Sequence, residues 1–244
     1  MMGRVIRTFI NRSPTKVGDE ILLPENEAIH LSRVLRLQIG ERFKALDGKG
    51  GSFLVECLDI SRSEVRGQIL SLNHSPPLLP EVRLVIALGK ANKWEDLIRP
   101  LTELGVTRLT PLITERTEGT FTKDKLGDKK QRWIKIAQEA CKQSGNPWMP
   151  RFDEPVGFSE VLSQPEANED RWIASLSEKV VSFRQNPKMQ KLSIFIGPEG
   201  GWSQEEEANA RDCGCSFFSL GAHVLRLETA AVSALAVARQ FVLR

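Results

Sequence analysis

The chain has 244 residues, of which 41% are hydrophobic and 27% are charged, and its formal net charge is +3. This composition is ordinary for a globular protein, which excludes a disordered chain and a membrane-embedded one, and the length allows two modest domains or one large one. No signal-peptide pattern opens the chain, so a cytoplasmic location is expected. The four cysteines show no metal-ligand spacing, and we expect reduced thiols and no metal.

Basic residues concentrate in the first third of the chain. They are Arg4, Arg7, Arg12, Lys16, Arg33, Arg36, Arg42, Lys44, Lys49, Arg62 and Arg66. Such an asymmetry indicates a surface that binds phosphates, although solvated surface charge would give the same pattern.

The N-terminal region has the pattern of short strands joined by turns. Strands are expected at residues 5–10, 20–23, 42–46, 52–60 and 65–72, the last two as a hairpin. Residues 24–36 are the one helical pattern, in which Ile29, Leu31, Val34 and Leu35 form an apolar stripe and leave Arg33 and Arg36 free. The sequence therefore predicts a small β-barrel with one basic helix, suited to holding RNA. His30 in that helix fits a packing or capping role better than a ligand role.

A proline-rich segment, residues 73–80, predicts a linker, because proline resists both helix and central strand. We expect domains at residues 1–74 and 81–244, joined by residues 75–80. Beyond the linker, strands (82–88, 106–113, 171–176, 192–196, 216–220) alternate with helices (94–104, 128–144, 203–214, 228–241). This alternation predicts an α/β domain with a parallel sheet covered on both faces. Pro100 should kink or interrupt its helix.

Two glycine-containing loops follow strands of the second domain. The first is Gly197-Pro198-Glu199-Gly200-Gly201, and the second begins at Leu220-Gly221 and leads into the last helix. Ser203 and Glu206 have the spacing of a capping box, so the first loop should run directly into a helix. Ligands bind parallel sheets at the carboxyl ends of strands, so these loops and residues 175–177 can form one pocket. A tight turn is the alternative for the first loop alone.

The alanine-rich final helix, residues 228–241, permits close backbone approach on one face. Packing within the core is favoured slightly over a contact between subunits.

These loops, with Leu225-Arg226-Leu227-Glu228-Thr229-Ala230, resemble the signature of the RsmE-type 16S ribosomal RNA uracil-N3 methyltransferases of the SPOUT superfamily. Further similarity comes from His30-Leu31-Ser32-Arg33-Val34-Leu35-Arg36-Leu37, Thr102-Glu103-Leu104-Gly105-Val106 and Glu139-Ala140-Cys141-Lys142-Gln143-Ser144. The resemblance covers nearly the whole chain.

The resemblance implies a PUA-like N-terminal barrel, a C-terminal SPOUT domain with a trefoil knot, a homodimer and S-adenosylmethionine as the cofactor. The implied substrate is a uridine in the decoding region of 16S ribosomal RNA within the assembled small subunit. The cofactor residues it implies are Leu176, Ile196, Gly197, Pro198, Glu199, Gly200, Gly201, Leu220, Gly221, Val224, Leu225, Arg226, Leu227 and Thr229. The RNA-binding residues are Arg7, His30, Arg33, Arg36 and Lys93, and the catalytic candidates are Arg226, Glu228 and Glu139.

The chain departs from the family pattern at Ala222-His223, where Pro-Arg is usual, at Pro100, where Lys is usual, and at Asn146, where Arg is common. The lost positive charges bear on RNA recognition more than on the cofactor pocket.

The chemistry of the reaction restricts the catalytic roles. The N3 atom of uracil carries a proton, so a base or stabilisation of the resulting anion is required. Arg226 stays protonated and can only stabilise negative charge, whereas Glu228 can act as a base or simply cap the helix that it begins. From its position alone, Glu139 is expected to be an exposed helix residue, and only the family resemblance makes it a candidate for the site. A ribose 2′-O methyltransferase of the same superfamily and a non-catalytic ribosome-binding protein of the same fold remain alternatives.

Overall fold

The computed structural model describes residues 5–89, 93–117, 124–176 and 189–242. These residues form two compact units. The first comprises Met1–Pro77 with Gln138–Met149, and the second comprises Leu78–Ala137 with Pro150–Arg244. No helix among the described residues is long and apolar enough to cross a membrane.

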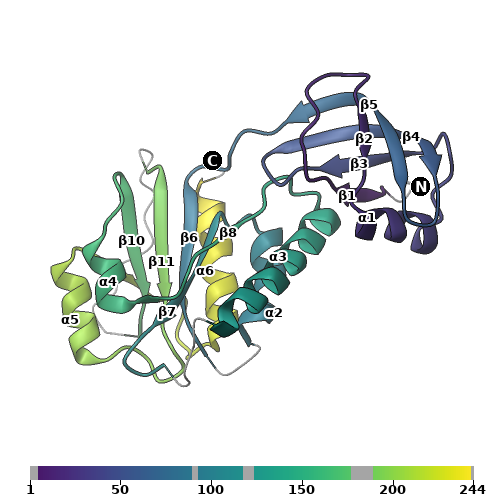
Figure 1. The fold of residues 1–244 in the computed structure, drawn as a ribbon. Helices are drawn as coiled ribbons and strands as arrows, with labels where there is room; N and C mark the ends of the chain where they lie inside the picture. The colour runs from purple at the N-terminus through teal and green to yellow at the C-terminus, as the bar shows by residue number, and fades with distance from the viewer. Residues whose placement is uncertain (1–4, 90–92, 118–123, 177–188, 243–244) are drawn as a thin grey trace. The chain divides into compact units, whose positions relative to one another are not determined.

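The first unit is built on a five-stranded sheet with the order β1-β3-β4-β5-β2 (Figure 1). Its strands are β1 (Arg7–Phe9), β2 (Glu20–Leu22), β3 (Arg42–Leu46), β4 (Gly51–Ile60) and β5 (Val65–His74). Pairing is antiparallel except between β1 and β3. Alternate residues of β4, such as Phe53, Val55 and Cys57, are buried in the core of this unit, as expected for a sheet with one solvated face.

The predicted basic helix is shorter and less regular than expected. It consists of α1 (Glu25–Ile29) followed by a π-helical turn, η1 (His30–Val34). Leu31 is fully buried, but Val34 is 64% exposed, so the prediction that Val34 belongs to the apolar stripe was wrong. The wider π turn rotates later residues away from the positions that a regular α-helix would give them. Arg33 and Arg36 are exposed, as predicted.

Residues 138–149 contribute the C-terminal end of a long helix, α3 (Asp124–Ser144), to the first unit. The Nζ atom of Lys142 lies 2.8 Å from Oε1 of Glu27 on α1, and both side chains are almost completely buried. The other carboxylate oxygen of Glu27 accepts a hydrogen bond from Thr8 Oγ1 at 2.6 Å. Because each buried charge has a partner, this pair ties the helix end to the sheet.

The second unit contains a wholly parallel sheet with the order β12-β10-β11-β6-β7-β8, in which β9 also pairs with β7. Its strands are β6 (Glu81–Ala87), β7 (Arg108–Ile113), β8 (Arg151–Phe152), β9 (Val156–Gly157), β10 (Glu169–Ala174), β11 (Lys191–Ile196) and β12 (Ser216–Phe218). Leu192, Ile194 and Ile196 on β11 are buried, as are Ser193 and Phe195 between them, which is typical of a sheet covered on both faces.

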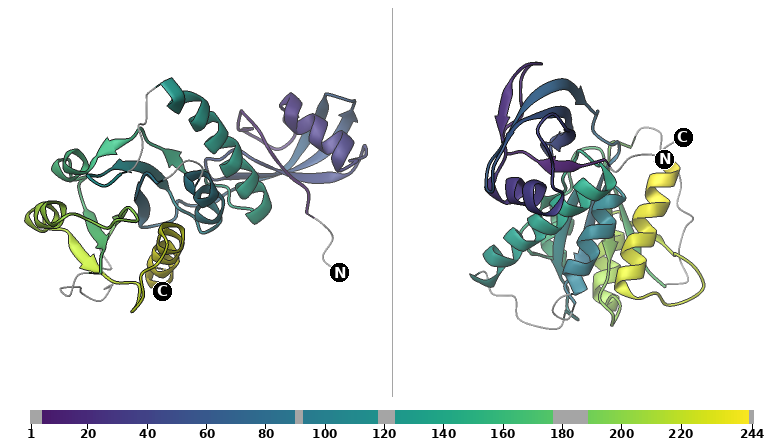
Figure 2. Two further views of the ribbon diagram at one scale, coloured as in Figure 1. Left: turned by 90° about the horizontal axis from the view of Figure 1, so that it is seen from below. Right: turned by 90° about the vertical axis from the view of Figure 1, so that its right-hand side faces the viewer.

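Helices cover both faces of this sheet. On one face, α4 (Phe158–Ser163) and α5 (Gln204–Asp212) pack against alternate strand residues that include Val85 and Phe195. On the other face, α6 (Leu227–Val242) contacts β6 and β11 and packs beside α2 (Lys93–Glu103), as Figure 2 shows.

The alanine-rich face of α6 lies partly in the core, where Ala231, Ala234 and Ala238 are fully buried. This is the packing role that the sequence slightly favoured.

Pro100 lies inside α2, which runs without interruption from Lys93 to Glu103. Of the two predicted outcomes, an interruption at this residue is therefore excluded, and a kink stays a prediction. The carbonyl of Pro100 still accepts a hydrogen bond from Leu104 N, and burial of Leu97, Ile98 and Leu101 stabilises the helix across the missing donor.

Candidate functional site

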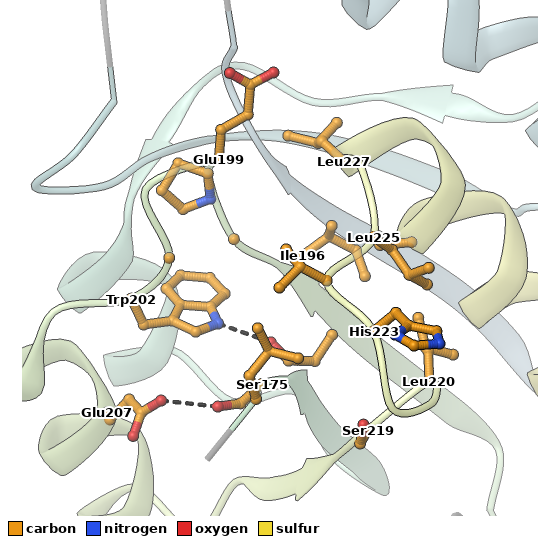
Figure 3. A pocket seen from close by; sticks show the side chains of 17 residues that line it. Ser175, Ile196, Glu199, Trp202, Glu207, Ser219, Leu220, His223, Leu225 and Leu227 are labelled. Atoms are coloured by element: carbon orange, nitrogen blue, oxygen red, sulfur yellow. Dashed lines mark hydrogen bonds between the residues drawn. The ribbon is translucent and has the colours of Figure 1, made fainter.

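A cavity of about 290 Å³ lies at the carboxyl ends of β10, β11 and β12 (Figure 3). These strands are adjacent in the sheet, so the three loops that follow them converge. The cavity is lined by Ala174, Ser175, Leu176, Ile196, Gly197, Pro198, Glu199, Gly201, Trp202, Glu207, Ser219, Leu220, His223, Val224, Leu225, Leu227 and Ala230.

Trp202 forms one wall of the cavity and is held in place on several sides. Its Nε1 atom donates a hydrogen bond to the carbonyl oxygen of Ala174 at 2.9 Å. The centroid of its ring lies 4.9 Å from the centroid of the Phe158 ring. A Cβ atom on Gly197 would lie 2.8 Å from Cε2 of Trp202. Only glycine therefore allows the chain to pass this ring at residue 197.

The turn that follows Gly197 leads directly into α5. Gly201 N donates to the carbonyl oxygen of Pro198 at 2.8 Å, and Gly201 adopts a φ of +70°, a region that favours glycine. Ser203 and Glu206 then form the predicted capping box, with Ser203 N donating to Glu206 Oε2 at 2.9 Å and Glu206 N donating to Ser203 Oγ at 3.2 Å. The capping box thus fixes the point at which the loop becomes a helix.

The loop after β10 is tied to its neighbours. Ser175 N donates to the carbonyl oxygen of Phe218 on β12 at 3.0 Å, and Ser175 Oγ donates to Glu207 Oε1 on α5 at 2.8 Å (Figure 3).

In the third loop, Ser219 Oγ donates to the carbonyl oxygen of Gly221 at 2.8 Å. Gly221 has a φ of +145°. The walls of the cavity are thus built from backbone turns and held by side-chain hydrogen bonds.

Most of the described residues that line the cavity are apolar. Among the described residues that line it, the titratable ones are Glu199, Glu207 and His223, and none is Lys or Arg. In Figure 3, Trp202 and Glu207 lie on one side of the space, and Ser219, Leu220 and His223 lie on the other. Such a site suits a ligand with a flat apolar part and a few hydrogen-bonding groups.

The structure brings together most of the residues expected to hold a cofactor. Leu176, Ile196, Gly197, Pro198, Glu199, Gly201, Leu220, Val224, Leu225 and Leu227 line the cavity. Gly200, Gly221, Arg226 and Thr229 are in the same segments but do not line it.

The catalytic candidates lie outside the lining. Arg226 is exposed, and its carbonyl oxygen accepts a hydrogen bond from Ala230 N at 2.9 Å. Glu228 is half-buried in the first turn of α6. Glu139 belongs to the first unit, where its carboxylate lies 2.7 Å from Lys142 Nζ.

The residues expected to bind RNA differ in their surroundings. Arg33 and Arg36 are exposed, and Arg36 has a φ of +54°, which is uncommon for a residue other than glycine. His30 is half-buried in η1. Arg7 Nη1 donates to the carbonyl oxygens of Lys142 and Gln143, each at 3.1 Å, so Arg7 caps the C-terminal end of α3. The side chain of Lys93 lies outside the described residues.

Sequence reasoning placed Ser175 in a loop of the pocket, but it did not single out six other residues that line the cavity, namely Ala174, Trp202, Glu207, Ser219, His223 and Ala230. The sequence could have indicated Trp202 as a lining residue, because it directly follows Gly200 and Gly201. Ser175 lies in the third loop that was predicted. No such indication exists for Glu207, since its position depends on how α5 leaves the capping box.

Both units resemble domains of known proteins. Residues 76–239 match the model of the RNA methyltransferase domain, and residues 23–70 match that of the RNA methyltransferase PUA domain. The chain is 36% identical over 213 residues to ribosomal RNA small subunit methyltransferase E of Synechocystis, covering 85% of this chain and 68% of that protein. It is 29% identical over 231 residues to the protein of the same name from Aquifex aeolicus, covering 94% and 98%.

Two solved structures that contain S-adenosylmethionine are similar over nearly the whole chain. One is ribosomal RNA small subunit methyltransferase E from Neisseria gonorrhoeae, with a TM-score of 0.88, 26% identity and coverage of 97% of this chain and 98% of that one. The other is a Legionella pneumophila protein, with a TM-score of 0.86, 28% identity and coverage of 97% and 98%.

Proposed function

The chain belongs to the family of ribosomal RNA small subunit methyltransferase E, with a PUA domain and a SPOUT methyltransferase domain, and on this premise we propose its reaction. It transfers the methyl group of S-adenosylmethionine to N3 of a uridine in the decoding region of 16S ribosomal RNA, within the small ribosomal subunit. The observation that carries the proposal is the cavity formed by three loops at adjacent strand ends, whose walls are the segments expected to bind the cofactor.

The residues of the cavity fit this cofactor. Gly197 leaves open a space that a Cβ atom would fill against Trp202, and the apolar lining suits an adenine ring. Pro198, Leu220 and Leu225 would hold the adenosine and methionine parts, while Ser175 and Glu207 offer hydrogen-bonding groups. The bound cofactor supplies an already activated methyl group, so the protein chiefly has to align that group with its acceptor.

The roles of the charged residues follow from the chemistry of uracil. N3 must lose its proton before it can attack a methyl group. Arg226, on the loop that forms one wall of the cavity, stabilises the negative charge that then develops on the uracil oxygens. Glu228 is the proposed acceptor of the N3 proton, with capping of α6 as its competing role. The pairing edge of the base has to be accessible, so the target nucleotide is unpaired or flipped out.

The first unit supplies the RNA-binding surface in this proposal. Arg33 lies in the π-helical turn η1, and Arg36 follows the end of that turn. Ser32 Oγ donates to the carbonyl oxygen of Arg62 in the neighbouring hairpin turn at 3.2 Å. Exposed guanidinium groups held on such a fixed backbone suit phosphate contacts. Arg7 and His30, also in the first unit, belong to the same proposal, and Lys93 is a proposed RNA-binding residue of the second unit.

Two remaining parts of the proposal come from the family resemblance, namely a trefoil knot in the SPOUT domain and a homodimer. The proposal also includes a cytoplasmic location. Glu139 stays a catalytic candidate on the ground of that resemblance alone, and its ion pair with Lys142 supports a structural role.

Incubation of the purified protein with unmodified small ribosomal subunits and radiolabelled S-adenosylmethionine tests the function. We expect transfer of label to 16S ribosomal RNA in assembled subunits and much less transfer to free RNA. Binding of the cofactor without transfer to either substrate would favour a non-catalytic ribosome-binding protein.

A further inference from the structure

A short turn after β7 contacts the glycine loop of the cavity, although neither the sequence motifs nor the comparisons point to it. The turn comprises residues 114–117. It is closed by a hydrogen bond from Thr114 N to Thr117 Oγ1 at 2.8 Å and by one from Thr117 N to the carbonyl oxygen of Thr114 at 3.1 Å. Thr114 is buried, so the turn has a fixed base on the sheet.

Two residues of this turn bind the loop that follows β11. Arg116 Nη1 donates to the carbonyl oxygen of Gly200 at 2.6 Å and lies 3.4 Å from that of Trp202. Glu115 N donates to Oε1 of Glu206, the capping-box residue that also accepts from Ser203 N. The turn therefore holds the loop near its middle and at the start of α5.

The aliphatic part of Arg116 also lies directly against the loop. A Cβ atom on Gly200 would be 3.4 Å from Arg116 Cδ and 3.7 Å from Arg116 Cβ. The guanidinium has several donors in a rigid plane, so it can bind two carbonyl oxygens without adopting two conformations.

We propose that Arg116 is a positioning residue that holds the glycine loop in the shape that binds S-adenosylmethionine. This inference rests on the proposed function. Adjacent glycines lose much conformational entropy when they become ordered, so a loop containing Gly200 and Gly201 needs external restraints to be ordered before the ligand arrives. Arg116 supplies such a restraint through its contacts with the carbonyl oxygens of Gly200 and Trp202, and the ring of Trp202 lines the cavity. A pre-ordered loop binds more tightly because binding no longer has to order it.

The test compares Arg116→Ala, Arg116→Lys and the wild type by calorimetric titration with S-adenosylmethionine. The matched control is Arg132→Ala, which removes an exposed arginine whose ion pair with Glu95, 2.9 Å long, lies elsewhere in the same unit. We expect the Kd of Arg116→Ala to rise at least tenfold and that of Arg116→Lys to rise less, because an ammonium keeps a donor. The Kd of Arg132→Ala should stay within twofold of the wild-type value.

Hydrogen exchange separates positioning from a general loss of stability. In Arg116→Ala without cofactor, the amides of residues 200–203 should exchange faster than in the wild type, while those of β6 and β11 stay unchanged. Unchanged affinity and unchanged exchange in Arg116→Ala would overturn the inference and leave the proposed function standing. Failure of the wild type to bind S-adenosylmethionine would instead defeat the proposed function.

Discussion

The contact between Gly197 and Trp202 gives the sharpest test of how the cavity is built. In Gly197→Ala, the new methyl carbon would lie 2.8 Å from Cε2 of Trp202 and 3.1 Å from its Nε1 atom, so the indole has to move. Movement breaks the 2.9 Å hydrogen bond to Ala174, whose loss costs about 1 kcal/mol. Overpacking against Phe158 adds about 1–3 kcal/mol.

We therefore expect the native loop conformation to lose about 2–4 kcal/mol, and even about 2 kcal/mol weakens binding of S-adenosylmethionine roughly thirtyfold. Calorimetric titration measures the change. Gly157→Ala is the control, because its new carbon would have only Glu160 Cβ nearby, at 4.0 Å. In a Trp202→Ala background the clash disappears, so Gly197→Ala should then weaken binding little further. Strict additivity of the two substitutions would refute the reasoning.

Three further predictions concern the first unit. Arg33→Glu combined with Arg36→Glu should weaken binding to small subunits and flatten the salt dependence of that binding, while leaving cofactor affinity unchanged. Unchanged subunit binding in a salt titration would show that this segment is not part of the RNA-binding surface. Lys142→Met leaves the Glu27 carboxylate buried without its ammonium, and urea unfolding should show a loss of about 3–5 kcal/mol; a loss below about 1 kcal/mol would contradict the buried pair. Burial raises the pKa of the Cys141 thiol to about 12, so iodoacetamide at pH 8.5 should not modify Cys141 in the folded protein but should modify it in urea; prompt reaction of the native thiol would contradict its burial.

The pH dependence of stability follows from the same region. Burial, the largest single influence, lowers the pKa of Lys142, but hydrogen bonds and charge from Glu139 and Glu27 outweigh it, so the pKa rises above 10.5. The stabilisation is thus fully present below pH 10.5 and is lost as the pH rises through the folded-state pKa. For Cys141 the stabilisation of the neutral thiol is present below pH 9.0 and is lost as the pH rises towards about 12. Unfolding midpoints should therefore fall between pH 9.0 and pH 12, and a flat profile there would argue against both effects.

Much of this architecture was predictable from local patterns. The predicted segments at residues 42–46 and 52–60 correspond to β3 and β4, and the Ser203–Glu206 capping box forms as expected. These features depend on neighbours in sequence, which a periodicity or a spacing records. The parallel sheet followed from alternation of strands and helices, and its strand ends placed the cavity.

The parts that sequence did not predict depend on contacts between distant residues. The sequence around Arg7 does not indicate that its guanidinium binds the carbonyl oxygens of Lys142 and Gln143. In the same way, the sequence around Arg116 does not indicate that its guanidinium binds the carbonyl oxygen of Gly200. The π turn at His30–Val34 changes which residues of the helix face the core. The prediction from apolar spacing failed there because it assumed a regular α-helix. The short strands β8 and β9 give too few residues for a pattern.

The modified nucleoside is the most direct test of the central claim. After the wild-type protein has reacted with unmodified small subunits and isotopically labelled S-adenosylmethionine, the 16S ribosomal RNA is digested to nucleosides and analysed by mass spectrometry. The proposed function predicts that the label appears in 3-methyluridine from a single site of the decoding region. Label confined to 2′-O-methylated nucleosides would contradict methylation at N3.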